Sequence, residues 1–407
     1  MTIAAKIEQT ISKSSWIRKM FEEGTRLKAK HGSENVFDFS IGNPNLPPPE
    51  AFQNAIETVA SQKDKSLHGY MANSGFLFVR EFVAEKIKAE SAKESAAEQV
   101  IKNITADDIV MTCGAAGGLN VVFKALLNQG EEVLVSRPFF VEYTFYADNH
   151  GGVLKTVPSN QDFTLNLDEI EKAITPKTRV MLINSPNNPT GQIYSEESLK
   201  ALGKILEKKS DEYGAIIYLV SDEPYRKIVF DNVNVPSIFP YYDQSIVATS
   251  HSKDLSLPGE RIGYLAINPN AKYRDKLRQA MALTNRILGF VNAPAIMQRV
   301  LPFLKDASVD IDAYRRKRDI FCEGLASAGY SFTTPPGAFY LFPRSPIEDD
   351  VKFVQALQEE LILAVPGSGF GGPGHFRLAF CVEDETIKKA IPAFKRVIEK
   401  FKFSHQS

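Results

Sequence analysis

A single lysine, Lys253, stands between two apolar runs in the stretch ATSHSKDLSLPGERIGYLAI (248–267). Ser250 lies three positions before it and Arg261 eight positions after it. A lysine amine that is poorly solvated, or that lies near other cations, has a lowered pKa and becomes a nucleophile towards carbonyl groups. A hydroxyl and an arginine fork are donors suited to phosphate. The stretch therefore predicts an amine beside an anion site, although most lysines are solvated surface residues.

Three more polar side chains follow apolar runs. Asp222 comes after AIIYLV (215–220), with Tyr225 three residues later, and Asn188 follows RVMLIN (179–184) in a rigid Asn-Pro-Thr-Gly turn. A carboxylate in such a position can keep a proton on a basic ring nitrogen, because an ion pair favours both charged forms. Taken singly, the aspartate is equally typical of a cap or turn, and the asparagine of a plain turn.

Small residues follow a further run, DIVMT (108–112). Gly114, Ala115 and Ala116 open a helical pattern at 115–128. Free backbone N–H groups at a helix start bind anions, and small side chains let a phosphate approach closely. The alternative is a tight strand-to-helix turn without a ligand.

Together these groups describe one ligand. They offer an amine for an aldehyde, a carboxylate for a basic ring nitrogen, an amide and a phenol for a phenolic oxygen, and an anion site for a phosphate. Pyridoxal 5′-phosphate carries all of these features, so we expect it as the cofactor.

The elements that must position these residues alternate along the chain. Expected strands cover 108–112, 131–136, 179–184, 215–220, 246–250 and 262–267 in the first part, and 337–343 and 375–380 after residue 300. Expected helices cover 15–30, 115–128, 195–209, 308–328, 350–362 and 384–401. Strands that are apolar on both faces and separated by helices predict a mostly parallel sheet covered on both sides. In such sheets ligands bind at the carboxyl ends of the strands.

We therefore predict an α/β fold with a three-layer αβα large domain and a smaller α/β domain. The smaller domain is expected to form from the C-terminal part and the N-terminal arm. The expected limits are 1–45 for the arm and crossing segment, 46–300 for the cofactor-binding domain and 301–407 for the small domain. A chain of 407 residues suits such a division.

Composition narrows the class of partner. The chain has 48 Lys and Arg residues against 49 Asp and Glu residues, a formal net charge of −1. This balance does not indicate a surface that binds nucleic acid. The apolar runs are too short for a membrane span, and no signal peptide is recognised. Three cysteines without C-x-x-C spacing argue against disulfides and structural zinc. We expect a cytoplasmic protein without a metal, whose partners are small molecules or a second copy of the chain.

With these residues in view, the chain resembles the aspartate-aminotransferase-like family of fold type I pyridoxal-phosphate enzymes. The resemblance runs from about Phe37 to Phe380. Its most specific motif is S-x-x-K-x(7)-R-x-G, formed by Ser250, Lys253, Arg261 and Gly263. The N-P-T-G and D-x-x-Y motifs precede it at distances similar to those of the family.

The resemblance implies a role for each cofactor contact. Lys253 carries the Schiff base, Asp222 pairs with the pyridine nitrogen, and Asn188 and Tyr225 bond the phenolic oxygen. Further implied contacts are the turn of Gly114, Ala115 and Ala116 with Ser250 and Arg261 on the phosphate, and Phe140 stacked on the ring. Without the resemblance, Phe140 is typical of a core aromatic.

It also implies substrate and partner contacts. Arg377 clamps the substrate α-carboxylate, which a guanidinium fork fits bidentately, and Gly42 belongs to a loop that closes over the substrate. Tyr70 reaches the phosphate in the partner subunit's site, in a pattern completed by Gly75 and Arg80. The active sites would then need a homodimer.

The activity implied is an aminotransferase acting on an L-amino acid and a 2-keto acid. The donor could be aspartate-, alanine- or aromatic-like, and 2-oxoglutarate is the expected acceptor. Relatives specific for dicarboxylates use a second arginine from the partner subunit. Arg286 is close to that position, but alignment on Asn292 and Pro294 leaves it one residue out of place.

Three alternatives stay open at this point. The same fold could host a carbon–sulfur β-lyase, or a non-catalytic cofactor-binding regulator, and fold alone cannot separate them. The run GSGFGG (367–372) satisfies G-x-G-x-x-G, but Pro373 and a strand follow it instead of a helix. We therefore interpret it as a substrate-side loop and disfavour a nicotinamide site.

Overall fold

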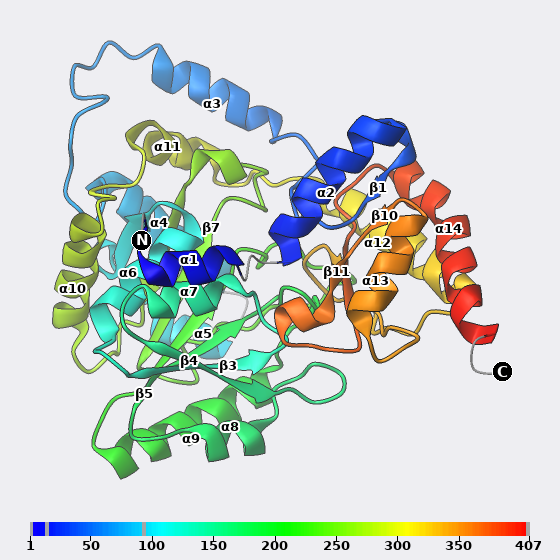
Figure 1. The fold of residues 1–407 in the computed structure, drawn as a ribbon. Helices are drawn as coiled ribbons and strands as arrows, with labels where there is room; N and C mark the ends of the chain where they lie inside the picture. Colours follow the sequence, from blue (N-terminus) through cyan, green and yellow to red (C-terminus); the bar gives the residue numbers. More distant parts are fainter. Residues whose placement is uncertain (1–2, 13–15, 92–94, 404–407) are drawn as a thin grey trace.

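The larger lobe is built on a seven-stranded sheet with the order β2-β8-β7-β6-β5-β3-β4. The computed structural model describes residues 3–12, 16–91 and 95–403. The strands are β2 (Ile109–Thr112), β3 (Glu132–Arg137), β4 (Val153–Pro158), β5 (Thr178–Asn184), β6 (Tyr218–Asp222), β7 (Ser245–Ser250) and β8 (Gly263–Ile267). Figure 1 shows helices packed around this sheet.

One strand of the sheet runs against the others. β3 pairs in parallel with β4 and β5, and the pairs β5–β6 and β6–β7 are also parallel. β8 pairs antiparallel with both β2 and β7. The carboxyl ends of the six like-directed strands therefore meet at one edge of the sheet, where β8 begins. The predicted mostly parallel sheet is confirmed.

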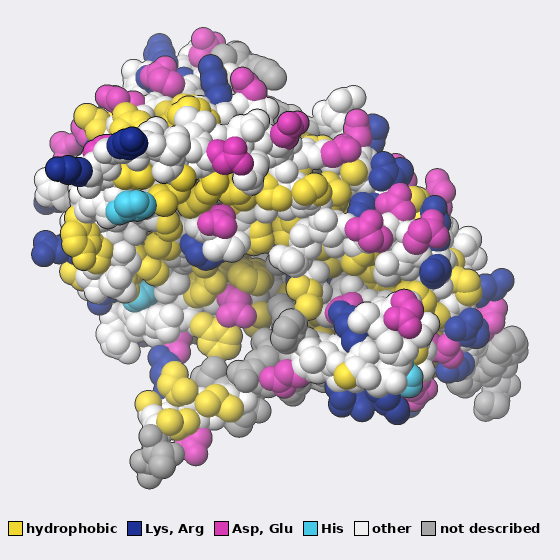
Figure 2. Space-filling model, turned by 90° about the horizontal axis from the view of Figure 1, so that it is seen from above, with side chains coloured by type: hydrophobic (Ala, Val, Ile, Leu, Met, Phe, Trp, Pro, Cys, Tyr) yellow, Lys and Arg dark blue, Asp and Glu magenta, His cyan; other side chains and the backbone are white. Residues whose placement is uncertain are grey.

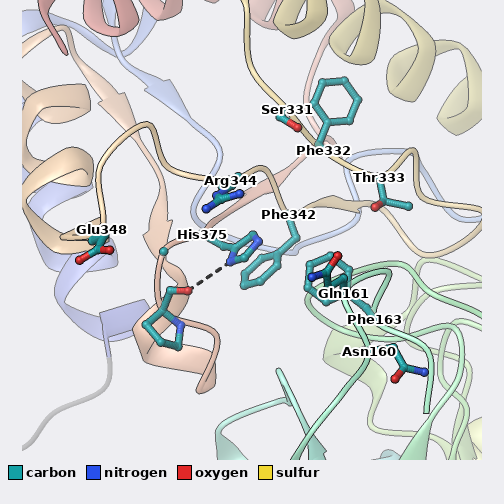
Figure 3. A pocket seen from close by; sticks show the side chains of 12 residues that line it. Asn160, Gln161, Phe163, Ser331, Phe332, Thr333, Phe342, Arg344, Glu348 and His375 are labelled. Carbon is teal, nitrogen blue, oxygen red and sulfur yellow. Dashed lines mark hydrogen bonds between the residues drawn. The ribbon is translucent and has the colours of Figure 1, made fainter. Parts of the chain in front are cut away.

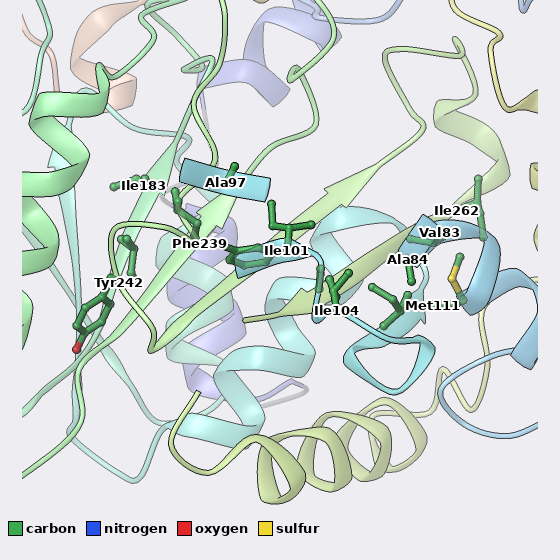
Figure 4. Close-up of a cluster of buried hydrophobic side chains, with 14 of the residues drawn as sticks. Val83, Ala84, Ala97, Ile101, Ile104, Met111, Ile183, Phe239, Tyr242 and Ile262 are labelled. Atoms are coloured by element: carbon green, nitrogen blue, oxygen red, sulfur yellow. The ribbon is translucent and has the colours of Figure 1, made fainter. Parts of the chain in front are cut away.

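Helices cover both faces of the sheet. α6 (Gly114–Leu126), α7 (Glu142–Asp148) and α10 (Arg274–Ile287) share one buried apolar cluster with one face. α3 (Glu50–Ala60), α4 (Leu77–Ser91), α5 (Ser95–Ile101), α8 (Leu167–Ala173), α9 (Glu196–Tyr213) and α11 (Ala295–Val300) share another. Figure 4 shows part of the second cluster, where Val83 lies close to Met111 of β2 and Ile101 lies beside Phe239. The three-layer architecture is thereby confirmed.

The smaller lobe combines the C-terminal part with the N-terminal arm (Figure 1). Its helices are α2 (Trp16–His31), α12 (Ile311–Ala328), α13 (Asp350–Glu359) and α14 (Asp384–Phe403). Its strands are β1 (Phe37–Asp38), β9 (Tyr340–Leu341), β10 (Ile362–Leu363), β11 (Val365–Pro366) and β12 (Phe376–Ala379). β12 lies antiparallel between β11 and β9, and β1 pairs in parallel with β10. Phe39 from the arm packs on Phe321 of α12, with ring centroids 4.8 Å apart.

The remaining elements are short. Helix α1 (Ala5–Ser12) lies in the first part of the arm. The 3-10 helices are η1 (Ser33–Asn35), η2 (Ala106–Asp108), η3 (Pro258–Glu260), η4 (Leu301–Leu304) and η5 (Gly367–Phe370). Within the described ranges, no helix combines the length and apolar character needed to cross a bilayer.

Most predicted elements form within a few residues of their expected limits. One correction matters for the site: β6 begins at Tyr218 instead of residue 215, so Asp222 ends the strand and does not follow it. β4 was not predicted, because it is an edge strand whose side chains are mostly exposed and form no apolar run. The domain limits at residues 45 and 300 stay a prediction.

Candidate active site

A cavity of about 300 Å³ opens at the carboxyl edge of the large sheet. We call it the inner cavity. Eleven of the predicted residues line it, namely Gly42, Ala115, Ala116, Phe140, Asn188, Asp222, Tyr225, Ser250, Lys253, Arg261 and Arg377. Gly114 directly precedes two of them. The strands and turns therefore bring together groups that lie more than 300 residues apart in the chain.

Lys253 lies in the turn after β7. Its Nζ donates a hydrogen bond of 2.8 Å to the carbonyl oxygen of Gly42. Burial lowers the pKa of this amine to about 8, and the positive charges of Arg377 and Arg261 act in the same direction, whereas Cys381 opposes them. A substantial neutral fraction therefore exists near neutral pH, as a nucleophile or proton acceptor requires.

Asp222, the last residue of β6, is only 5% exposed. Its Oδ2 accepts a hydrogen bond of 2.6 Å from the Tyr143 hydroxyl, whereas its buried Oδ1 has no partner among the described residues. Burial raises the pKa of this carboxyl to about 7, although the hydrogen bond from Tyr143 lowers it. A cationic N–H group placed at Oδ1 would satisfy the oxygen and restore the charged form.

Helix α6 begins at a tight turn. Gly114 has a φ of +71°, and a Cβ placed there would lie 2.8 Å from Nη2 of Arg261. The Arg261 guanidinium donates to the carbonyl oxygens of Pro258 at 2.9 Å and Cys113 at 3.4 Å. These contacts hold the guanidinium beside the first N–H groups of the helix, so charge and backbone donors point to one place.

Two serines flank the same turn from the β7 side. The Ser250 hydroxyl donates to the Ser252 hydroxyl at 3.1 Å, and both side chains are buried. Ser252 was missed by the sequence analysis. Its position one residue before the lysine, two residues past the expected strand end at residue 250, was a signal that could have found it.

Arg377 lies on β12 and is 2% exposed. Its Nη1 donates to Oδ1 of Asn188 at 3.1 Å and its Nη2 to the carbonyl oxygen of Ser40 at 2.6 Å. The guanidinium carbon lies 4.6 Å from the ring centroid of Tyr340 and 4.7 Å from that of Phe370. Burial lowers the pKa of this group, but a guanidinium stays protonated in proteins. Arg377 is thus a desolvated cation, and its buried Nε has no partner among the described residues.

An asparagine that was not predicted ties the strand ends together. Asn184, the last residue of β5, accepts a hydrogen bond of 2.7 Å from the backbone N–H of Asn188. Its Nδ2 donates to the carbonyl oxygen of Asp222 at 2.8 Å. The Asn188 turn and the Asp222 strand are thereby fixed relative to each other. Asn184 ends a predicted strand, so position alone could have marked it.

Tyr143 and Tyr340 were also missed, as was Tyr146, which lines the same cavity. Tyr143 lies in α7 and Tyr340 in β9, and both line the inner cavity. The Tyr340 hydroxyl lies 2.7 Å from that of Tyr225. Neither tyrosine carries a spacing signal, because each reaches its partner only through the packing of distant elements.

Three residues considered above differ in how deeply they are buried and in whether they line the inner cavity. Phe140 is half-buried at the cavity wall, edge-on to Tyr143 with ring centroids 5.5 Å apart. Tyr70 is 92% exposed and does not line the cavity. Arg286 is exposed in the last turn of α10 and also lies outside the cavity lining. Tyr70 and Arg286 therefore lie outside the inner cavity of their own chain.

A larger cavity of about 840 Å³ lies elsewhere. We call it the outer cavity. It opens between the loop after β4 and the small lobe, and Figure 3 shows Phe163, Phe342 and His375 on its wall. None of the predicted site residues lines it. Within the described ranges, no cluster of His, Cys, Asp and Glu is arranged to hold a metal ion.

Comparisons with known proteins agree with this geometry. The sequence profile of the family described as "Aminotransferase class I and II" matches residues 34–394. A protein of Methanocaldococcus jannaschii named "Probable aspartate aminotransferase" is 30% identical over 400 residues, covering 95% of this chain and 98% of that protein. An "Aromatic-amino-acid aminotransferase 2" of Thermococcus litoralis is 28% identical, with 95% and 96% covered. The crystal structure of an amino transferase from Eubacterium rectale superposes with a TM-score of 0.93 at 39% identity, covering 98% of this chain and 99% of that one.

Proposed function

The chain belongs to the class I and II aminotransferases, a family that depends on pyridoxal 5′-phosphate, and from that premise we propose that its inner cavity is the transaminating site. The enzyme would move an amino group between an L-amino acid and a 2-keto acid. The observation that carries this proposal is the convergence of Lys253, the unpaired Oδ1 of Asp222 and Arg377 on one small cavity.

The residues of the inner cavity fit the cofactor feature by feature. The unpaired Oδ1 of Asp222 suits a protonated pyridine nitrogen, and the buried amine of Lys253 suits the aldehyde carbon. Asn188 and Tyr225 would bond the phenolic oxygen, and Phe140 would stack on the ring. The phosphate would lie on the turn of Gly114, Ala115 and Ala116, with Ser250 and Arg261 as further donors. Each of these assignments is part of the proposal.

When bound, the cofactor supplies an electron sink for the carbanion that forms at the substrate α-carbon. Asp222 keeps a proton on the ring nitrogen and so maintains that sink. Arg377 binds and orients the substrate carboxylate. The rings of Tyr340 and Phe370, which lie against its guanidinium, exclude water from this contact. Lys253 Nζ then takes the proton from the α-carbon, with its pKa of about 8 matched to the task.

Substrate choice follows from the carboxylate clamp only in part. Arg377 would accept the α-carboxylate of any amino acid, so the donor could be aspartate-, alanine- or aromatic-like. The relatives named for aspartate and for aromatic amino acids support the first and the third of these donors. We propose 2-oxoglutarate as the 2-keto acid.

A homodimer is part of the proposal, because Tyr70 is 92% exposed and would reach the phosphate only in a partner's site. Exposed apolar side chains support such a contact, among them Leu77, Phe78, Leu283 and Ile287. Figure 2 shows hydrophobic side chains in a band across the face seen from above. Mixing Tyr70→Ala with Lys253→Ala chains should restore about a quarter of the sites by random pairing. Failure to restore activity would exclude shared sites.

A half-reaction screen tests the activity itself. Holoenzyme is mixed with single amino acids without a keto acid, and the visible absorption band of the bound cofactor is followed. Fast conversion to the aminated cofactor with some amino acids is expected, and the fastest of them name the donor. No conversion with any amino acid would contradict the proposal. Release of pyruvate from cystathionine would indicate a lyase instead.

A further inference from the structure

We propose that Tyr340 is a positioning residue that strengthens the hydrogen bond from Tyr225 to the phenolic oxygen of the cofactor. This inference rests on the proposed function of the inner cavity. Tyr340 lies on β9 in the small lobe, is 2% exposed, and places its hydroxyl 2.7 Å from that of Tyr225. Nothing in the spacing of the motifs assigns it a role.

The number of protons fixes the direction of this hydrogen bond. A tyrosine hydroxyl has one proton to donate and can accept at the same time. If Tyr225 gives its proton to the cofactor's phenolic oxygen, the 2.7 Å contact to Tyr340 requires Tyr340 to be the donor. A hydroxyl that accepts one hydrogen bond becomes a better donor in the next, because hydrogen-bonded chains polarise one another.

The surroundings keep Tyr340 protonated and in place. Burial raises the pKa of its phenol to about 12, which the charge of Arg377 opposes, and burial raises that of Tyr225 well above its usual value. The Gly42 loop packs directly on the Tyr340 hydroxyl, since a Cβ on Gly42 would lie 2.0 Å from it. The hydroxyl therefore has little freedom to turn away from Tyr225.

The ring of Tyr340 has a separate task. The guanidinium carbon of Arg377 lies 4.6 Å from its centroid, and Phe370 covers the guanidinium at 4.7 Å. The ring thus helps to hold the carboxylate clamp, whereas the hydroxyl faces the tyrosine on the cofactor side. The two effects can be separated, because phenylalanine keeps the ring and removes only the hydroxyl.

The readout is the pH midpoint at which the absorption band of the lysine-linked cofactor changes. A hydrogen bond donated to the phenolic oxygen favours the form that carries more negative charge there, which is the form that has lost the proton of the lysine-linked nitrogen. The titratable and charged groups that face the tyrosine pair are Lys253 after β7, Arg377 on β12 and Cys381 after β12. Removing the Tyr340 hydroxyl leaves these three side chains in the protein, so the comparison changes only one hydroxyl.

Tyr340→Phe should raise this midpoint by about half a pH unit. The variant loses the strengthening of about 10–30% that the Tyr340 hydroxyl gives to the charge-assisted hydrogen bond from Tyr225. Its KM for the amino donor should stay within about twofold, because the ring remains over Arg377. Tyr340→Leu should raise the midpoint similarly and also raise KM by about tenfold. Tyr225→Phe, which removes the direct donor, should shift the midpoint further than either.

Fluorotyrosine incorporated at position 340 gives a test of opposite sign. Fluorine makes the phenol a stronger donor without changing its shape, so the midpoint should fall below that of the wild type. This arm also decides the matter if the phenylalanine variant does not fold. Midpoints unchanged with both phenylalanine and fluorotyrosine, in an enzyme whose wild type shows the band, would overturn the inference. A wild-type enzyme that acquires no band would instead overturn the proposed function.

Discussion

The larger of the two cavities, the outer one, is not the one whose lining indicates chemistry. The outer cavity has about 840 Å³ and the inner about 300 Å³. Yet the inner cavity is lined by two buried polar atoms without partners among the described residues, Asp222 Oδ1 and Arg377 Nε. The lining of the outer cavity, as far as it is described, holds none. A site for chemistry is marked by polar groups that await a partner, and volume is a poor guide to it.

In the outer cavity, aromatic side chains of the wall pack against one another instead. The rings of Phe342 and His375 stack at 5.2 Å and 4°, and Phe163 meets both edge-on at about 5.5 Å. These contacts join the loop after β4 to the small lobe, and among the described residues of this wall no buried side-chain polar atom lacks a partner. The comparison therefore predicts that equivalent substitutions will have unequal effects in the two cavities.

Lys253→Ala should have the largest effect. In the proposed assignment, removing the amine eliminates both the anchor of the cofactor and the proton acceptor, so the rate should fall by roughly 10²–10⁴-fold or more. Single-turnover conversion of an amino acid is the measurement, with thermal unfolding as the control for folding. Normal turnover together with the usual absorption band would contradict the assignment.

Arg377→Gln and Arg344→Gln form a matched pair, since each removes one arginine of the small lobe from one cavity. Arg377→Gln should lower kcat/KM by about 10²-fold, because a desolvated carboxylate loses its charged partner. Arg344 is exposed on the wall of the outer cavity, and its substitution should change kcat/KM by less than about twofold. Equal losses in the two variants would remove the distinction between the cavities.

Asp222→Asn tests the burial of an unpaired carboxyl in the cofactor-free protein. The folded-state pKa of about 7 lies above that of a free aspartate, so the native state binds the proton more tightly than the unfolded chain. The bound proton contributes fully to the stability of the folded state below about pH 4, and this contribution is lost as the pH rises to about 7. Relative to the variant, the wild type should lose roughly 4 kcal/mol of unfolding free energy over that window, about 1.4 kcal/mol for each of the three pH units.

Denaturant unfolding of both proteins between pH 4 and 8 measures this difference. Parallel pH dependences for wild type and variant would mean that Asp222 is not the buried group described here. Addition of the cofactor should reduce the difference, because a protonated ring nitrogen would pair with the carboxylate.

Tyr143→Phe should have the smallest effect of the four. Its hydroxyl donates to Asp222 and lowers the pKa of that carboxyl, so its loss should raise the pKa further. A carboxyl that is more often neutral is a weaker partner for the ring nitrogen, and kcat should fall by several-fold, or about 1 kcal/mol. The fall should be steepest on the acid side of the pH profile. A uniform loss at all pH values would indicate a packing defect.

The sequence located the residues that follow strands, and the reason is geometric. Lys253, Asp222 and Asn188 lie at the ends of apolar runs, and the carboxyl ends of parallel strands meet at one edge. The antiparallel direction of β8 and the edge strand β4 could not be found this way, because pairing direction and edge position leave no mark in an apolar run.

The residues that were missed act through contacts between distant segments. Tyr143 meets Asp222 across 79 residues of sequence, and Tyr340 meets Tyr225 across 115. Aromatic residues at such positions are typical of core packing, so their type gives no signal of its own. Only the packing of α7 and β9 against the sheet edge shows which hydroxyls point into the inner cavity.

The central claim is that Lys253 anchors the cofactor in the inner cavity. The most direct measurement is to reduce the holoenzyme with borohydride, digest it, and find by mass spectrometry which lysine has gained the reduced cofactor. The account predicts a single modified peptide that contains Lys253, in an amount close to one per chain, and no modification in Lys253→Ala. Modification of a different lysine, or none despite a visible absorption band, would contradict the account.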